Sequence, residues 1–187
     1  MKTGLLFFAV ICVLSLGYEF FVTFVAQVAA PDKANGSLLY VDGKVVGSEL
    51  IGQSFTSPGY FHGRPSAVDY DATNSGGSNY GPTSEQLMEQ VKARIEQVRK
   101  ENNLPPDQPV PADLVLASGS GLDPDISVDS ALLQVARVAK ERSLLEADVR
   151  TLVKQHTLPP DLGFIGQERV NVLKLNIALD ELAKGKK

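Results

Sequence analysis

Residues 4–30 read GLLFFAVICVLSLGYEFFVTFVAQVAA, an apolar run of 27 residues that carries one formal charge, on Glu19. As an α-helix this run would be about 40 Å long, which exceeds the hydrocarbon thickness of a bilayer, about 30 Å. A cleaved signal peptide is the alternative, with Lys2 before the apolar run and Val28-Ala29-Ala30 as the cleavage site. Because signal peptides have apolar stretches of only about 7–15 residues, the length favours a retained transmembrane helix over residues 1–30.

Four polar residues interrupt this run at a spacing of four, which places them along one stripe of a helix. They are Ser15, Glu19, Thr23 and Gln27. An ionisable side chain inside a membrane is costly and normally faces protein or water, so the stripe favours a contact face for other transmembrane helices. A lone anchor helix that tolerates these residues is the alternative. Lys2 indicates a cytoplasmic N-terminus, although Lys33 flanks the other end of the run.

The other 157 residues hold 38 of the 40 charged residues, 17 basic and 21 acidic. This acidic excess gives no basic surface for nucleic acid, so nucleic-acid binding is excluded as a function. The single cysteine, Cys12, lies in the apolar run, which excludes an intrachain disulfide framework and a thiolate metal cluster. With only His62 and His156 besides, the chain offers little for a histidine metal site.

The polar part predicts a mixture of helices and strands. Asp42-Gly43 between two apolar runs indicates a hairpin over residues 37–50, and the aromatic residues of the irregular segment 51–82 favour order there. Further along, the patterns predict a helix from a capping box at 83–86, a strand at 111–117, a helix capped by Ser127, and helices at 145–156 and 169–183. We therefore expect an α+β protein, in which a single N-terminal transmembrane helix precedes one small mixed domain, residues 31–187.

Two glycine-rich stretches, 75–78 and 118–121, invite comparison with phosphate-binding loops. Neither is followed by the Lys-Ser/Thr pair that a P-loop needs, so we interpret both as tight turns that require positive φ. The alternating acidic run that begins at Asp123 resembles a calcium loop. However, Val128 and Gln134 stand where that loop needs Gly and Glu, so we reject the calcium site.

Ser118 or Ser120 could form a hydrolase triad with His156 and an aspartate, which would make the chain a membrane-tethered extracytoplasmic hydrolase. The G-x-S-x-G signature of a nucleophile elbow is missing around both serines, so the pattern does not favour this function. A membrane-tethered ligand-binding domain is a further alternative. On its residues alone, we expect the chain to carry no chemistry of its own.

Several blocks of the sequence together resemble the C subunit of the Kdp potassium-transporting ATPase, and they extend over almost the whole chain. The blocks are residues 35–37, 51–55, 60–66, 75–82, 110–115, 117–124, 134–139 and 169–173. The resemblance implies an accessory subunit of a bacterial, ATP-driven, high-affinity potassium uptake pump. Its implied partners are a channel-like potassium-binding subunit, a P-type ATPase subunit and membrane lipid.

The resemblance also implies a location and two roles. It places the chain in the bacterial inner membrane as a single-pass protein, with a cytoplasmic N-terminus and an extracytoplasmic polar domain. One implied role is assembly of the complex, and the other is that of a catalytic chaperone raising the ATP affinity of the ATP-hydrolysing subunit. By family match Gln134 would contact ATP, although an exposed helix glutamine is the favoured interpretation of this residue. ATP and potassium would otherwise be handled by the partner subunits, and no cofactor or metal is expected on this chain.

Overall fold

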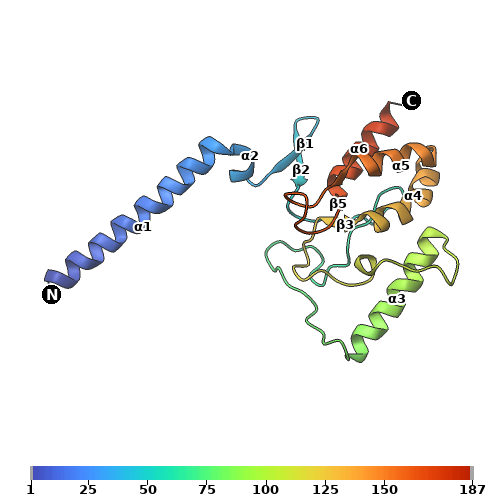
Figure 1. Ribbon diagram of the computed structural model, residues 1–187, viewed down its shortest axis with the longest axis horizontal. Coiled ribbons are helices and arrows are strands. Elements are labelled where there is room, and N and C mark those ends of the chain that lie inside the picture. The colour runs from blue at the N-terminus through green and yellow to red at the C-terminus, as the bar shows by residue number, and fades with distance from the viewer. Residues whose placement is uncertain (1, 186–187) are drawn as a thin grey trace. The chain divides into compact units, whose positions relative to one another are not determined.

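The computed structural model describes residues 2–185, and the chain divides into two compact units, Met1–Ser48 and Glu49–Lys187. The first unit begins with helix α1 (Lys2–Ala29), drawn in blue in Figure 1. No residue of this helix is buried. Among the described residues, α1 is the helix that is long and apolar enough to cross a membrane. A short helix, α2 (Pro31–Ala34), follows it. These features agree with the predicted N-terminal span, whose bilayer boundary at residue 30 stays a prediction.

The predicted hairpin is present in the first unit. Strand β1 (Leu38–Val41) pairs antiparallel with β2 (Lys44–Ser48). At the turn Asp42 has φ 49° and Gly43 has φ 76°. Positive φ at both central residues defines the type I′ turn, whose twist matches that of the flanking strands. The Asp-Gly pair therefore forms the tight turn that the sequence predicted, and the register of the two strands shifts between Leu39 and Tyr40.

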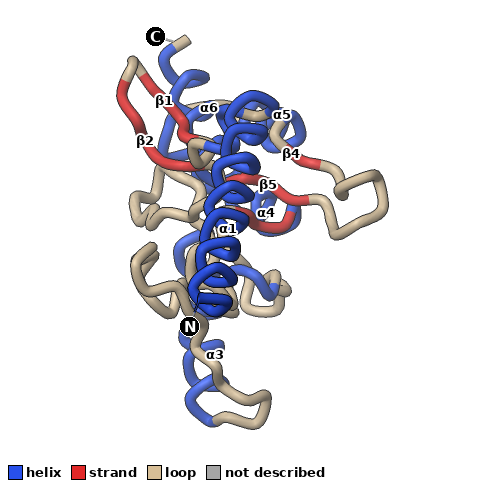
Figure 2. Tube along the Cα trace, turned by 90° about the vertical axis from the view of Figure 1, so that its left-hand side faces the viewer, coloured by secondary structure: helices blue, strands red, loops and turns tan. Residues whose placement is uncertain are grey.

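The second unit combines helices with one small sheet. Its helices are α3 (Glu85–Asn102), α4 (Val128–Arg142), α5 (Glu146–Gln155) and α6 (Val172–Lys184), with a 3₁₀ turn, η1, at Ala112–Leu114. Its strands are β3 (Asp125–Ser127), β4 (Thr157–Leu158) and β5 (Arg169–Asn171), and they form an antiparallel sheet in the order β3-β5-β4. The segment between β2 and α3 holds no helix or strand and is drawn as tan tube in Figure 2. The predicted α+β class is confirmed.

Side-chain caps fix where three of these helices begin. Ser84 accepts a hydrogen bond from the backbone N–H of Leu87, so α3 starts one residue later than a cap at Thr83 would require. Ser127 caps α4, as predicted. Asn171 caps α6 through the N–H of Lys174. Each cap satisfies a backbone donor that has no partner within its own helix.

Two sequence predictions in this unit are wrong. The segment 111–117 forms the turn η1 instead of a strand, because Pro111 lacks an N–H to donate to a sheet. The single helix predicted at 169–183 begins only at Val172. The three residues before it form β5, in which Val170 pairs with Ile126 of β3. Strands of two or three residues carry too little periodicity for the sequence to reveal them.

The core of the second unit lies between the helices α4, α5 and α6 and the sheet. Its fully buried members come from all three helices, from β5 and from one loop residue, Phe61. Phe61 is 0% exposed, and it lies in the irregular segment 51–82. Its burial agrees with the prediction that aromatic residues order this segment. That segment is therefore held against the helices, and it carries the side chains of the candidate site.

Candidate functional site

Two buried side-chain amides hold the loop around Phe61 by its backbone. The Asn176 side chain accepts from the Phe61 N–H at 2.9 Å and donates to the Phe61 carbonyl at 3.0 Å. The Gln134 side chain accepts from the N–H of His62 at 2.8 Å and donates to its carbonyl at 3.1 Å. The amides thus replace the strand partner that this extended segment lacks, and they satisfy backbone groups that burial would otherwise leave unpaired.

A buried arginine continues this network. Arg137 is 7% exposed, and its guanidinium donates to Asn102 Oδ1 at 3.0 Å, to Gln134 Oε1 at 2.7 Å, to the Tyr60 carbonyl at 2.9 Å and to the Pro58 carbonyl. All four acceptors are neutral oxygens. Burial lowers the pKa of the Arg137 guanidinium from its ordinary value. The side chain therefore acts as a clamp that joins α4, the end of α3 and the loop 58–60.

The loop is clamped from α4 a second time. Arg142 donates to the Gly59 carbonyl at 2.7 Å, and it lies over the ring of Tyr60 with 4.3 Å between its Cζ and the ring centre. The same guanidinium pairs with Asp180 of α6 at 2.6 Å, and Asp180 also accepts from the Tyr60 hydroxyl at 3.1 Å. These contacts hold Gly59 and Tyr60 against α4 and α6.

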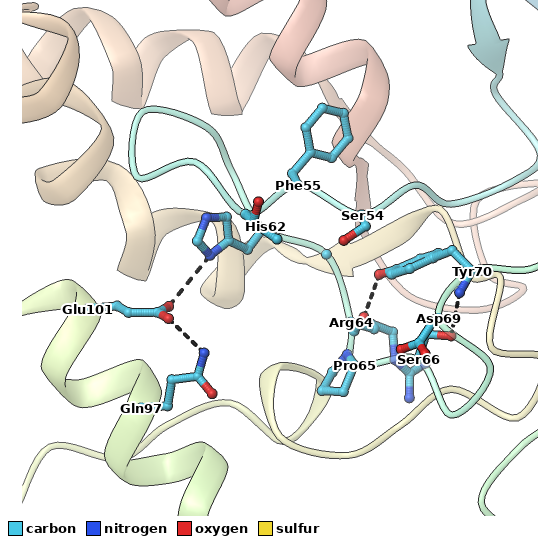
Figure 3. Close-up of a pocket in the computed structure, with 12 residues that line it drawn as sticks. Ser54, Phe55, His62, Arg64, Pro65, Ser66, Asp69, Tyr70, Gln97 and Glu101 are labelled. Carbon is cyan, nitrogen blue, oxygen red and sulfur yellow. Dashed lines mark hydrogen bonds and ion pairs between the residues drawn. The ribbon is translucent and has the colours of Figure 1, made fainter.

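The clamped loop forms one wall of a polar pocket of about 360 Å³. Its lining comes from the loop and from α3: Ser54, Phe55, Thr56, His62, Gly63, Arg64, Pro65, Ser66, Asp69, Tyr70, Gln97 and Glu101. Figure 3 shows His62 and Glu101 directed toward each other, with 3.5 Å between His62 Nδ1 and Glu101 Oε2. Gln97 donates to Glu101 from one turn earlier in α3, at 2.8 Å. A smaller cavity of about 200 Å³ adjoins the pocket and has Gln134 in its wall.

Ser66 and Tyr70 shape the other wall of the polar pocket. Asp69 and Tyr70 both have left-handed φ, 51° and 60°. Ser66 Oγ accepts from the Tyr70 N–H at 2.9 Å, and the Tyr70 hydroxyl donates to the Arg64 carbonyl at 2.5 Å. Burial, with the nearby charge of Asp123, raises the pKa of the Tyr70 phenol. Tyr70 therefore stays a neutral hydrogen-bond donor that closes the turn.

The charge state of His62 follows from its surroundings. Burial lowers the pKa of its imidazole from the ordinary 6.5, and the charge of Arg137 adds to the effect, whereas Glu101 opposes it. Its Nε2 lies 3.0 Å from the carbonyl oxygen of Ser57. His62 is thus a hydrogen-bonded loop residue, and it is neutral near pH 7.

This arrangement predicts a loss of stability on acidification. The unfolded chain protonates His62 near pH 6.5, whereas the folded chain does so only at lower pH. The stability that neutral His62 provides is therefore present above pH 6.5 and falls as the pH falls. We expect the melting temperature of the wild type to drop more than that of His62→Gln between about pH 7.5 and about pH 5.5. Equal drops in the two proteins, measured by circular dichroism in detergent, would contradict this assignment.

Gln134 differs from its favoured sequence interpretation. An exposed helix glutamine was expected, but the side chain is 1% exposed and its oxygen and nitrogen are both hydrogen-bonded. The helical period of α4 contains the signal for this burial, because position 134 lies on the same face as Ala131 and Val138. Asn176 and Arg137 were not singled out in the sequence, although Asn176 likewise stands between Leu173 and Leu179 on the buried face of α6. The contact of Gln134 with ATP stays a prediction.

The two glycine-rich stretches contact each other. The Gly76 N–H donates to the Ser120 carbonyl at 2.9 Å, and a Cβ on Gly77 would come within 3.1 Å of the Gly119 carbonyl oxygen. Of the glycines in these stretches, Gly121 alone has positive φ, 68°. The expectation of tight turns with positive φ is therefore correct only for Gly121. Close approach of two backbones explains the glycine at 77, whereas a Cβ on Gly76 would meet only Val68 Cγ1, at 3.9 Å.

Gly121 and Gly119 form a matched pair for substitution. A Cβ on Gly121 would overlap Val68 Cγ2 and lie 2.8 Å from the Gly76 carbonyl oxygen, whereas a Cβ on Gly119 meets no atom within 4 Å. We expect Gly121→Ala to lower the free energy of unfolding by at least about 2 kcal/mol, from the left-handed backbone and the overlap together. Gly119→Ala should change it by less than about 0.5 kcal/mol. Chemical denaturation of the full chain measures both, and equal effects would contradict the contact between the two stretches.

The serines and the histidine considered for a hydrolase are not arranged as a catalytic triad requires. Ser120 Oγ accepts from the Leu122 N–H at 3.1 Å, and Ser118 is 3% exposed. His156 follows α5 as its C-terminal cap, and its Nδ1 lies 3.0 Å from the Leu152 carbonyl oxygen. Among the described residues, no hydrogen bond joins Ser118 or Ser120 to a histidine. The geometry does not favour a hydrolase.

The acidic run near Asp123 is engaged in ion pairs and a cap. Asp123 pairs with Arg64 at 2.8 Å, and Asp125 lies 3.3 Å from Arg169. Burial raises the pKa of the Asp125 carboxyl, against the hydrogen bond from Asn171. Residues 2–185 contain no group of three or more His, Cys, Asp or Glu placed to hold a metal ion. The run therefore serves local structure at the start of α4.

The polar stripe of α1 is exposed along its whole length. At its end, Gln27 exchanges two hydrogen bonds with Asn35, at 3.2 Å and 3.3 Å, which ties α1 to the residue after α2. For Ser15, Glu19 and Thr23, the described part of the chain provides no hydrogen bond to another side chain. The role of this stripe as a contact face stays a prediction.

Comparison with known proteins agrees with the sequence blocks. The family described as KdpC: K+-transporting ATPase, c chain, matches residues 1–181. A protein named potassium-transporting ATPase KdpC subunit from Gemmatimonas aurantiaca is 52% identical over 187 residues, covering 98% of this chain and 93% of the relative. Proteins of the same name from Nitratidesulfovibrio vulgaris and Dechloromonas aromatica are 54% and 51% identical, covering 90% and 96% of this chain and 87% and 95% of the relatives. The chain therefore belongs to the KdpC family, the c chain of the K+-transporting ATPase, as its sequence blocks predicted.

Proposed function

We propose that this chain is a non-catalytic accessory subunit that assembles and stabilises an ATP-driven potassium uptake complex in the bacterial inner membrane. The observation that carries the proposal is α1, which has no buried residue and exposes both apolar side chains and the polar stripe, in a chain that belongs to a family of pump subunits. Lipid would cover the apolar side chains, and polar groups of neighbouring transmembrane helices would meet the stripe. The partners would be a channel-like potassium-binding subunit and a P-type ATPase subunit.

The polar domain is proposed to lie outside the cytoplasm, with the N-terminus inside. Lys2 supports this orientation through the positive-inside rule. ATP and potassium are then handled by the partner subunits. Because the Gln134 side chain is buried and already hydrogen-bonded, any effect of this chain on the ATP affinity of the pump would act through assembly. A topology reporter fused after Lys187 tests this, and a cytoplasmic C-terminus would overturn it.

Purification tests the assembly role directly. A tagged full chain, extracted in mild detergent from cells that produce the whole system, should bring with it a P-type ATPase subunit and a potassium-binding subunit with many transmembrane helices. Recovery of the chain alone, under conditions that keep other membrane complexes intact, would overturn the proposal.

The polar stripe gives a sharper prediction. We expect Glu19→Leu to reduce the pump subunits recovered with the chain by about three- to thirty-fold, because polar contacts between transmembrane helices contribute about 0.6–2 kcal/mol. Phe21→Leu is the matched control, since two residues further along a helix the side chain points to the opposite face. Quantitative immunoblotting of the purified complex measures the difference. Equal recovery with the two variants would show that the stripe is no contact face.

A further inference from the structure

The loop between β4 and β5, residues 159–168, exposes large apolar side chains at its tip. We call these residues the apolar loop. Leu162 is 82% exposed, Phe164 is 78% exposed and Ile165 is 51% exposed. Figure 2 shows the loop projecting beyond the ends of β4 and β5. Adjacent apolar residues this exposed are unusual in a folded domain, and such patches mark interaction sites.

The apolar loop is ordered by its own hydrogen bonds. Asp161 and Ile165 form a β-bridge, in which each N–H donates to the other's carbonyl at 2.9 Å. Leu162, Gly163 and Gly166 all have positive φ, 54°, 83° and 88°. Left-handed backbone is unfavourable for leucine, so the loop holds Leu162 at its tip against local preference. The ordered backbone of the loop therefore holds these apolar side chains in an exposed position.

Arg169 fixes the apolar loop to the sheet. Its guanidinium lies 3.2 Å from Asp161 in the loop and 3.3 Å from Asp125 at the start of β3. Because the loop is ordered before any partner binds, docking would cost little conformational entropy. A preformed apolar tip on a rigid base is the arrangement that supplies the central side chains of protein interfaces.

The charges around the apolar loop indicate whether it binds a protein or a lipid surface. The apolar loop carries Asp161 and Glu168, its flanking Arg169 is engaged by two carboxylates, and the whole chain has a net charge of -4. Loops and helices that enter a membrane surface combine apolar side chains with free basic residues, which meet anionic headgroups. Asp161 and Glu168 form an acidic rim beside the apolar tip. This rim disfavours binding to an anionic membrane surface, and it also disfavours binding to a second copy of the same loop. It fits an apolar pocket with a basic rim.

We propose that the apolar loop docks Leu162 and Phe164 into an apolar pocket with a basic rim on another subunit of the pump, outside the membrane. This inference rests on the proposed assembly function and names one surface through which it acts. The contact is separate from the polar stripe of α1, so the chain would hold its partners at two places.

Photo-crosslinking tests the occupant. The photoreactive residue benzoylphenylalanine is placed at position 164 of the full chain, in cells that produce the whole pump. Position 145 is the control. Leu145 is also exposed, at 68%, but it stands alone at the start of α5. We expect light to attach position 164, and not position 145, to another subunit of the pump. Attachment to lipid only, attachment to a second copy only, or no attachment while the pump stays assembled would each overturn the docking proposal.

Substitution tests the energetics. Leu162→Asn suits the left-handed backbone, and combined with Phe164→Ser it removes the apolar tip. We expect this double variant to dissociate from the purified pump at least about tenfold faster than wild type, with an unchanged melting temperature, whereas Leu145→Asn should dissociate like wild type. Wild-type dissociation rates in the double variant would overturn the docking proposal alone. Failure of the wild-type chain to purify with any pump subunit would overturn the proposed function, and the docking proposal with it.

Discussion

Phe61→Ala is expected to lower the free energy of unfolding of the second unit by about 3–5 kcal/mol, the range for a large aromatic side chain removed from a core. Phe61 is 0% exposed and packs with residues of α4, α5, α6 and the sheet. Its backbone is held on both sides by Asn176, so the loop cannot move inward to fill the cavity without breaking two buried hydrogen bonds. Limited relaxation places the cost at the upper part of the range.

The full chain in detergent is suited to this measurement. It has no tryptophan, and three of its five tyrosines, Tyr60, Tyr70 and Tyr80, lie in the second unit. Guanidinium unfolding is followed by near-ultraviolet circular dichroism of the tyrosines. Phe164→Ala makes the same chemical change at a side chain that is 78% exposed, and it should alter stability by less than about 0.5 kcal/mol. Equal effects at positions 61 and 164 would contradict the placement of Phe61 in the core.

Gln134→Leu is expected to lower the free energy of unfolding by at least about 2 kcal/mol. Leucine matches glutamine in size but leaves the N–H and the carbonyl of His62 without their side-chain partner, and a buried group left in this way costs about 1–3 kcal/mol. It also removes the neutral oxygen that Arg137 contacts at 2.7 Å. Gln86→Leu, at an exposed position early in α3, is the matched control and should have little effect.

The same variant separates a structural role of Gln134 from a contact with ATP. A ligand that binds only the folded chain raises its melting temperature. Because the side chain is 1% exposed and hydrogen-bonded at both ends, we expect ATP to leave the melting temperatures of both the wild type and Gln134→Leu unchanged. A rise in the wild type that is lost in the variant would establish the ATP contact and contradict this expectation.

The features that the sequence predicted correctly are those encoded by neighbouring residues. The turn at Asp42-Gly43 and the cap at Ser127 depend on side chains within three residues of the backbone groups they serve. The long apolar run likewise identifies α1 without reference to the rest of the chain. Local chemistry of this kind survives in the folded structure because nothing distant competes with it.

The candidate site could not be predicted in the same way, because distant residues build it. His62 and Gln134 are 72 residues apart in sequence, and Phe61 and Asn176 are 115 residues apart. A loop has no period from which its partners can be inferred, and an amide in a helix is usually exposed. Only the position of Gln134 and Asn176 on apolar helix faces marked them as buried, and that signal identifies no partner.

These separations bear on how the protein is made. Synthesis runs from the N-terminus, so the loop at residues 58–62 emerges well before α6 (Val172–Lys184). Helix α6 supplies Asn176, whose side chain hydrogen-bonds the Phe61 backbone. Until α6 has left the ribosome, the Phe61 backbone lacks its hydrogen bonds to Asn176 and the core lacks the residues of α6. A nascent chain whose α1 has already entered the membrane would therefore carry an incomplete domain. The core of the second unit can close only after α6 has been synthesised.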